Sequence, residues 1–194
     1  MNRFIDSHNR TFWGNFRTSG TWHFSLVPTP VPNGNNPTID VAISIQGDTL
    51  QLSYFISKHG LVLDEFITPI RADFLWQKTC LECFFDVGQS DYIEMNFTPQ
   101  GEYNLYHFDD YRTPNALPPV WADGLVFMVD GVVLDNFYTY HLSIKSDNTP
   151  IMNVHKINPT AILYEHGEPI FYAVQHKSPP DFHDKTFWQK IKPT

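Results

Sequence analysis

The chain has 194 residues, of which 42% are hydrophobic, 15% aromatic and only 18% charged. This is the composition of a globular protein rich in aromatic rings, and the length suits one domain spanning residues 1–194. The formal net charge is −8 at pH 7, and no run of basic residues could follow a phosphate backbone. Nucleic acid and anionic membrane surfaces are therefore excluded as expected partners.

The beginning of the chain lacks the features of an export signal. Residues 1–16, MNRFIDSHNRTFWGNF, include a positive charge at Arg3 but no continuous apolar region. No stretch approaches the roughly 18 apolar residues that indicate a membrane-spanning helix. Two cysteines are too few for a disulfide framework in a chain of this size. We therefore expect a cytoplasmic protein without a membrane anchor.

Apolar residues recur with a period of two along most of the chain, which predicts strands. In residues 38–57, TIDVAISIQGDTLQLSYFIS, two alternating runs meet at Gly47 and Asp48, and this pattern predicts a hairpin. No long helix is indicated. An antiparallel β-sandwich is the expected fold, and a small lipocalin-like barrel is the alternative. The other expected strands are residues 20–27, 79–87, 91–98, 102–108, 124–129, 132–144 (with a break near Asn136), 160–165 and 169–175.

Two segments are expected to be loops. Residues 27–37, VPTPVPNGNNP, are rich in proline and are followed at once by a strand. Residues 109–124, DDYRTPNALPPVWADG, form the longest irregular stretch. Because long loops on a rigid scaffold often carry function, residues 109–124 are predicted to be a binding loop.

Residues 79–108 predict a three-stranded meander whose register can be derived. If the first hairpin turns at GQSD, paired residues have numbers that sum to about 178, since neighbouring strands run antiparallel. Glu82 then lies opposite Asn96, and Phe84 lies opposite Glu94. One face of this meander should be apolar and the other should be polar and aromatic.

The second turn, TPQGE, extends the same alignment to a third strand. It places Asn96 beside Asn104 and Glu94 beside Tyr106, because successive side chains alternate between the faces of a sheet. The predicted polar face contains Glu82, Phe84, Glu94, Asn96, Asn104 and Tyr106. The predicted core face contains Leu81, Cys83, Phe85, Ile93, Met95, Phe97, Tyr103 and Leu105. A slip by one residue would place the apolar set in water.

The C-x-x-C spacing of Cys80 and Cys83 resembles a redox motif. Three residues along a strand separate their Cα atoms by about 10 Å at roughly 3.3 Å per residue. A disulfide needs less than about 7 Å. These cysteines are therefore not expected to form a redox pair.

Metal binding and catalysis are two other functions that these residue types could serve. The nine histidines are scattered singly and form no H-E-x-x-H motif, so no metal site is predicted, although ligands could converge from distant strands. Glu82 and Glu94 could in principle act as the two acids of a glycosidase. Because amide side chains surround them, a holding function is expected and no enzyme activity. A merely solvated outer sheet face is the simpler alternative.

Three stretches of sequence resemble one known family. They are LWQKTCLECFF at residues 75–85, YIEMNFTPQGEYNLYHFDDYR at 92–112 and HKSPPDFHD at 176–184. Their order and spacing resemble the DOMON-like proteins related to family-nine carbohydrate-binding modules, over most of the chain from Arg71 to Asp184. The resemblance implies a β-sandwich with jelly-roll-like strand order. It also implies a non-catalytic module that binds a small-molecule carbohydrate or another small polyol.

In those sugar-binding modules aromatic rings stack on a sugar while polar groups bind its hydroxyls. By analogy Trp76 is the stacking candidate, and Trp121 and Tyr111 are the nearest candidates for a second ring. Asp181 and His183 are expected to cap the C-terminal segment. The residues predicted to bind ligand are Arg71, Trp76, Glu82, Glu94, Asn96, Tyr106 and Arg112. Structural alternatives are a half-buried edge position for Trp76 and surface ion pairs with Asp73, Asp109 or Asp110 for the two arginines.

Other DOMON domains hold haem between a methionine and a histidine. Met95 belongs to the predicted core face, and Met152 with His155 is a single pair that does not define a haem site. No cofactor is therefore expected. A haem- or metal-binding domain and a protein-interaction domain remain the alternative functions, and the oligomeric state is left open.

The predicted polar face also leads to an expectation for stability. If this face meets solvent, a change at Glu82 should alter the free energy of unfolding by no more than roughly 0.5 kcal/mol.

Overall fold

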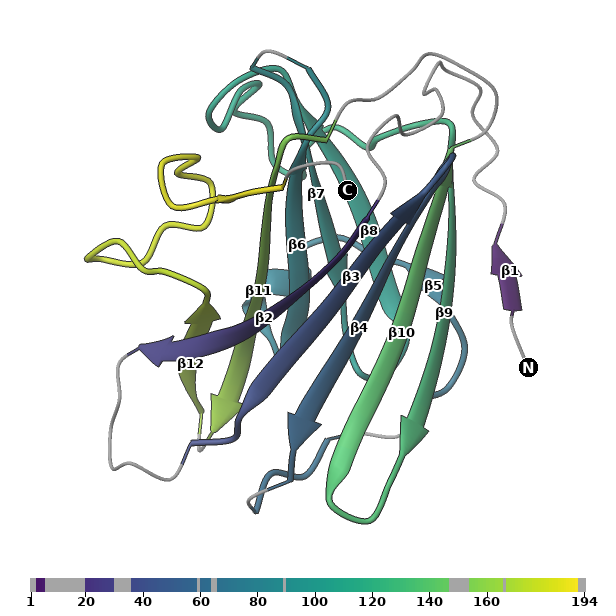
Figure 1. Ribbon diagram of the computed structural model, residues 1–194, viewed down its shortest axis with the longest axis vertical. Helices are drawn as coiled ribbons and strands as arrows, with labels where there is room; N and C mark the ends of the chain where they lie inside the picture. The colour runs from purple at the N-terminus through teal and green to yellow at the C-terminus, as the bar shows by residue number, and fades with distance from the viewer. Residues whose placement is uncertain are drawn as a thin grey trace.

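The fold is all-β and consists of two packed layers of strands (Figure 1). In the described residues the single helical element is a 3₁₀ turn, η1 (Leu75–Gln77). None of the helical structure described is long and apolar enough to cross a membrane. The computed structural model describes residues 20–29, 36–58, 60–63, 66–88, 90–146, 154–165 and 167–191, together with the backbone of residues 3–5.

Each predicted stretch of alternation is a strand, and the bounds differ by a few residues. In chain order the strands are β1 (Arg3–Ile5), β2 (Gly20–Thr29), β3 (Ile39–Gln46), β4 (Thr49–Ser57), β5 (Ile70–Arg71), β6 (Cys80–Asp86), β7 (Tyr92–Phe97), β8 (Glu102–Phe108), β9 (Leu125–Val133), β10 (Phe137–Ser146), β11 (Lys156–Glu165), β12 (Glu168–Ala173) and β13 (Gln189–Lys190). The expected break near Asn136 is the turn between β9 and β10. The expected loop at 27–37 begins later, because β2 continues to Thr29; residues 30–35 lie outside the described residues.

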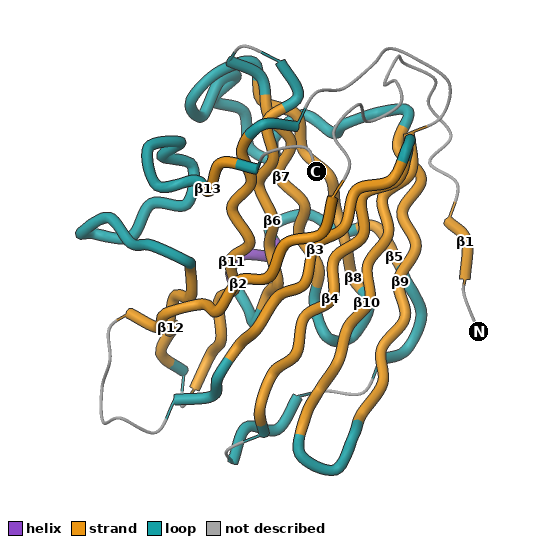
Figure 2. The backbone as a smooth tube through the Cα atoms, in the orientation of Figure 1, coloured by secondary structure: helices purple, strands orange, loops and turns teal. Residues whose placement is uncertain are grey.

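The strands form two sheets that share one edge (Figures 1 and 2). The first sheet has the order β1-β9-β10-β4-β3-β2, and the second has the order β12-β11-β6-β7-β8-β5, with β13 pairing with β11. Pairing of β12 with β2 joins the two. All pairs are antiparallel except β5 with β8. The prediction of an antiparallel sandwich is confirmed.

The core lies between the two layers and contains the apolar face of every long strand. Ile43 and Ile45 of β3 and Leu50 of β4 are fully buried there, as their alternation predicts. Rings bridge the layers: the Tyr103 ring of β8 stacks on the Phe127 ring of β9 with centroids 4.5 Å apart. Side chains fill this interior, so the molecule is a packed sandwich rather than a barrel that encloses its ligand.

The predicted register of the meander is confirmed at every position. Glu82 pairs with Asn96 and Phe84 with Glu94 between β6 and β7, while Asn96 pairs with Asn104 between β7 and β8. All eight residues of the predicted core face belong to the main buried cluster. The six residues of the polar face therefore share the outer side of the second sheet.

Candidate ligand-binding pocket

The polar face of the meander is covered, and its expected exposure to solvent is wrong. Glu82 is 2% exposed, Glu94 4%, and Asn96 is fully buried. The 109–124 loop and the C-terminal segment lie over this face and help to enclose a pocket. A second aromatic cluster forms beneath them, in which Trp188 packs with rings from β6, β7 and β8. The alternation of apolar and polar residues shows which side chains share a face of the sheet. It gives no information about which other segments cover that face.

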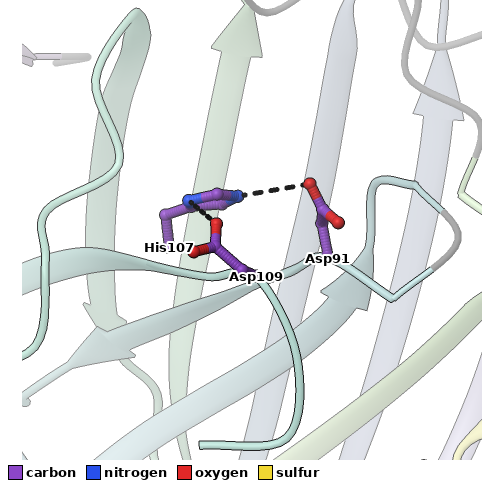
Figure 3. Close-up of side chains that lie close together, drawn as sticks. All are labelled: Asp91, His107 and Asp109. Atoms are coloured by element: carbon purple, nitrogen blue, oxygen red, sulfur yellow. Dashed lines mark ion pairs between the residues drawn. The ribbon is translucent and has the colours of Figure 1, made fainter. Parts of the chain in front are cut away.

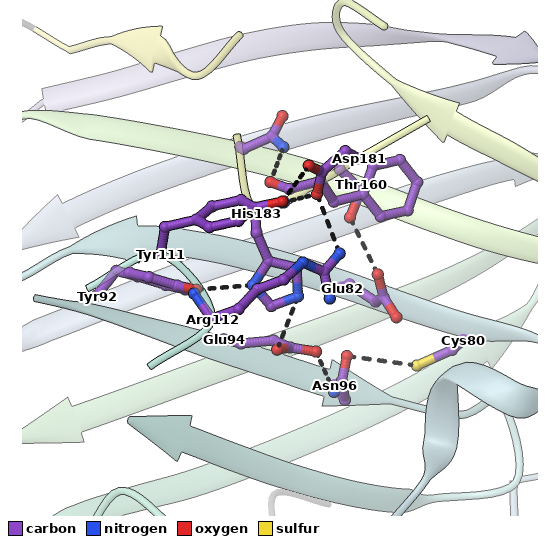
Figure 4. Close-up of polar contacts among 12 residues, drawn as sticks. Cys80, Glu82, Tyr92, Glu94, Asn96, Tyr111, Arg112, Thr160, Asp181 and His183 are labelled. Atoms are coloured by element: carbon purple, nitrogen blue, oxygen red, sulfur yellow. Dashed lines mark hydrogen bonds and ion pairs between the residues drawn. The ribbon is translucent and has the colours of Figure 1, made fainter. Parts of the chain in front are cut away.

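The pocket has a volume of about 280 Å³, close to the lower end of the roughly 300–1,000 Å³ usual for small-molecule sites. Aromatic rings form part of its wall, and residues 114–117 of the predicted binding loop also line it. The lining rings are Trp76, Phe84, Phe108, Phe171 and Phe182. The lining groups that carry titratable or charged atoms are Glu82, Glu94, Arg112, Asp181 and His183. Figure 4 shows that these titratable or charged side chains converge from three parts of the chain: the meander, the binding loop and the C-terminal segment.

Asp181 ties the binding loop to the C-terminal segment (Figure 4). The Tyr111 hydroxyl donates to Asp181 Oδ2 at 2.7 Å, and Arg112 Nη2 donates to Oδ1 at 3.0 Å. Burial raises the pKa of Asp181, but these hydrogen bonds outweigh it and hold the pKa below its usual value. The Arg112 backbone has a φ of 49° in the left-handed region, and its N–H donates to the Tyr92 hydroxyl at 3.1 Å.

A chain of polar contacts runs under the pocket from Tyr92 to Asn96 (Figure 4). The Tyr92 hydroxyl and His183 Nδ1 share a hydrogen bond of 2.7 Å. His183 Nε2 lies 3.7 Å from Glu94 Oε2, and Asn96 Nδ2 donates to Glu94 Oε1 at 2.8 Å. These contacts hold the Glu94 carboxyl group in one position at the pocket wall.

Burial has the largest effect on the pKa values of Glu82, Glu94 and His183. It raises the pKa of Glu94 to about 7, although the Asn96 hydrogen bond and the charge of Arg112 oppose the change. The pKa of Glu82 is also raised, first by burial and then by the nearby Glu94. Burial and the positive charge of Arg112 lower the pKa of His183 to about 3, so this imidazole is neutral at pH 7. Glu94 is therefore partly protonated near neutral pH, and burial shifts the pKa of Glu82 in the same direction.

The structure brings together four of the seven predicted ligand-binding residues. Trp76, Glu82, Glu94 and Arg112 all line the pocket. Trp76 is half-buried and packs edge-on against Tyr106, with centroids 6.0 Å apart. Their role in binding stays a prediction.

The other three predicted residues lie outside the lining. Asn96 is buried behind Glu94, and the hydroxyl of buried Tyr106 donates to Asp73 at 2.9 Å. Arg71 lies over the Trp121 ring, 4.7 Å from its centroid. It is separated from Arg112 along β8, because β5 pairs Arg71 with Tyr103 near the start of that strand, whereas Arg112 follows its end at Phe108.

Two residues assigned to a capping role belong to the pocket as well. Asp181 does accept a hydrogen bond from the His183 backbone N–H at 3.2 Å, as a cap would. Both side chains nevertheless line the pocket, and Arg112 pairs with Asp181 rather than with Asp109 or Asp110. Both residues lie in PDFHD, residues 180–184, which is part of the family resemblance. The sequence alone does not show that this segment folds over the meander.

The two cysteines are free and fully buried, on opposite faces of β6. Burial raises the pKa of both thiols, and the nearby Glu82 adds to the rise at Cys80. The predicted placement of the two thiols on opposite faces of the strand is confirmed, since Cys83 lies in the main core and Cys80 contacts Asn96.

These thiols are expected to resist modification in the folded protein, because the reactive species is the thiolate. Ellman's reagent should label neither cysteine under native conditions and should label both after unfolding in guanidinium. A redox role would be indicated instead by rapid labelling of one thiol in the native protein.

The described residues bring one group of potential metal ligands together, outside the pocket (Figure 3). Asp91 lies 3.7 Å from His107 Nε2, and Asp109 lies 3.6 Å from His107 Nδ1. The carboxylates thus approach different nitrogens of one ring, which suits ion pairing better than binding one metal ion. Of the haem candidates, Met95 is buried in the core, His155 is exposed, and Met152 lies outside the described residues.

Comparisons with known proteins bear on the fold. No family model matches the sequence, and no curated protein matches it significantly. Among solved structures, a protein from Bacteroides uniformis ATCC 8492, described as a "putative carbohydrate-binding protein", has a TM-score of 0.57 at 11% sequence identity. The similarity covers 89% of this chain and 85% of that chain. It supports the sandwich fold independently of the sequence motifs.

Proposed function

We propose that the chain is a binding module for a carbohydrate or another small polyol, and that it does not turn its ligand over. The observation that carries this proposal is the composition of the pocket: aromatic rings and fixed hydrogen-bonding groups line the same space. Sugars present C–H groups on their faces and hydroxyls on their edges, so they require both kinds of partner. The sequence resemblance, from Arg71 to Asp184, supports a DOMON-like module related to family nine, and we propose that residues 1–194 form this one domain.

A solved structure with a similar fold adds support to the proposal of carbohydrate binding. The Bacteroides uniformis protein with the similar fold is itself described as carbohydrate-binding. Glycoside hydrolysis requires two carboxyl groups that flank the scissile bond. Glu82 and Glu94 instead extend from adjacent strands on the same face of one sheet. They form one side of the pocket.

Trp76→Ala is expected to weaken binding of a glycan by about 10- to 100-fold, since a stacked ring buries apolar area and contributes on the order of 1.5–3 kcal/mol. A glycan array identifies the ligand, and titration calorimetry measures its Kd for each variant. Trp121→Ala is the matched control, because Trp121 is a 44% exposed tryptophan outside the pocket lining. Equal losses in both variants, or an array without any ligand, would contradict the proposal. In the second case, binding to a protein partner would favour an interaction domain.

A further inference from the structure

The charges that line the pocket are unbalanced. Three carboxyl groups, those of Glu82, Glu94 and Asp181, face one guanidinium, that of Arg112. Arg112 already pairs with Asp181 at 3.0 Å, and Lys177 approaches Asp181 at 3.8 Å on its exposed side. The remaining two carboxyl groups belong to Glu82 and Glu94. In the described part of the chain, no lysine or arginine forms an ion pair with either glutamate.

The protein itself offers these glutamates neutral partners. Asn96 donates to Glu94 at 2.8 Å, and the Thr160 hydroxyl donates to Glu82 at 3.4 Å. His183, whose Nε2 lies 3.7 Å from Glu94 Oε2, is neutral because burial lowers its pKa to about 3. A buried carboxylate without a cation is costly, yet both carboxyl groups reach the pocket lining, where a ligand could supply the charge.

We infer that the pocket selects ligands that carry a protonated amine on the polyol, as amino sugars do, and that the amine binds between Glu82 and Glu94. The inference rests on the proposed function and names its ligand class. An ammonium group has three N–H donors, which suits two carboxyl groups that extend from adjacent strands. The rings of Phe84 and Phe108 line the same pocket, and aromatic faces attract cations.

Arg112 forms its ion pair with Asp181 rather than with a glutamate, although its charge lowers the pKa of Glu94 in part. Its guanidinium donates to Asp181, and the Tyr111 hydroxyl holds the other oxygen of that carboxylate. The guanidinium also lies over the Tyr111 ring, 5.7 Å from its centroid. Arg112 and Asp181 therefore form a neutral pair at one side of the pocket, which leaves the two glutamates as the carboxyl groups that a cationic ligand could ionise and pair with.

Binding of an amine should release protons from the glutamates, because an ammonium group pairs with the ionised carboxylates. Burial keeps the pKa of both groups raised, so the affinity for an amine should increase from pH 5.5 to pH 7.5. A neutral sugar should show little of this dependence. The titratable and charged groups that face the pair are Tyr54, Cys80, Tyr92, Tyr106, Arg112, Asp181 and His183. Of these, His183 stays neutral over that pH range.

Calorimetry with three sets of sugars tests the inference. The probes are glucosamine, galactosamine and mannosamine, each compared with its parent hexose and its N-acetyl derivative at pH 7.5. We expect at least one free amine to bind about 10- to 100-fold more tightly than both neutral counterparts, as hydrogen bonds to charged groups imply. Titrations at pH 6.5, where the sugar amine is still protonated and Glu94 largely holds its proton, in buffers of different ionisation enthalpy should show proton release for that amine alone.

The variant Glu94→Gln should remove most of the preference for the amine over its two neutral counterparts, since it removes the charge and keeps the shape. Glu82→Gln should act in the same direction. Circular dichroism checks that each variant is folded. If the neutral sugars bind as tightly as the amines, the inference is overturned and the proposed function stands. If none of the nine sugars binds, the inference is overturned, and the glycan array decides separately on carbohydrate binding.

Discussion

Replacing Phe97 with alanine is expected to lower the free energy of unfolding by about 3–5 kcal/mol, the range for large-to-small changes of a buried phenylalanine. Phe97 is fully buried in β7 and packs across the sandwich against two strands of the other sheet. Its ring centroid lies 6.3 Å from that of Phe127 and 5.7 Å from that of Tyr140. The substitution would leave a cavity between the layers. Urea denaturation monitored by fluorescence measures the change.

Phe137→Ala is the matched control for this experiment. Phe137 begins β10 in the opposite sheet and is 42% exposed, so its removal should cost no more than about 0.5–1 kcal/mol. Equal destabilisation by both substitutions would contradict the assignment of the core to the space between the sheets.

Replacing Glu94 with glutamine is expected to stabilise the ligand-free protein at pH 8. Burial raises the pKa of this carboxyl group from 4.5 to about 7, and a shift of one pKa unit corresponds to about 1.4 kcal/mol. Ionised Glu94 therefore lowers the free energy of unfolding by roughly 3 kcal/mol above pH 7. Glutamine cannot ionise, and its side-chain oxygen can still accept the hydrogen bond from Asn96.

The dependence on pH follows from the direction of this shift. Because the folded state binds the proton more tightly than the unfolded state, stability falls as pH rises from about 4.5 to about 7. The gain from Glu94→Gln should therefore be small near pH 4.5, increase over this range and then level off. His183, whose pKa is lowered to about 3, contributes the opposite slope below pH 6.5. This contribution is common to both proteins and largely cancels in their difference.

Thermal and urea unfolding of both proteins from pH 4.5 to pH 8 measure this difference. Glu168→Gln, at an exposed position in β12, should change stability little at any pH. A loss of stability in Glu94→Gln at pH 8 would show that the ionised carboxylate supports the fold. The expected gain would instead identify a residue that weakens the free protein, and such residues are typical of functional sites.

The burial of the polar face also changes what is expected for a substitution at Glu82. A solvent-facing carboxylate would hardly affect stability, but Glu82 is 2% exposed, and its backbone carbonyl accepts a hydrogen bond from Tyr54 of β4 across the sandwich. Changes at the polar face are thus expected to alter stability and binding together. Binding must for this reason be measured on protein whose folding has been checked.

Local pattern was sufficient to predict the long strands, and the pairing within the β3–β4 hairpin and the β6–β7–β8 meander. The alternation in residues 38–57 predicted the β3–β4 hairpin, and that in residues 79–108 predicted the pairing of Glu82 with Asn96. These features follow from the sequence because side chains alternate along a strand and a slip of one residue would expose a whole apolar face. Cys80 and Cys83 were placed on opposite faces for the same reason.

The pocket depends on contacts between residues that are far apart in the sequence. Arg112 meets Asp181, 69 positions away, while Arg71 lies with Trp121 outside the pocket lining. In the sequence both arginines looked equally suitable as donors. Their separation follows from the order of strands and from the path of two irregular segments, which have no periodicity that predicts what they cover. Burial of Glu82 and Glu94, and the raised pKa of each, arises from that cover and could be seen only in the folded protein.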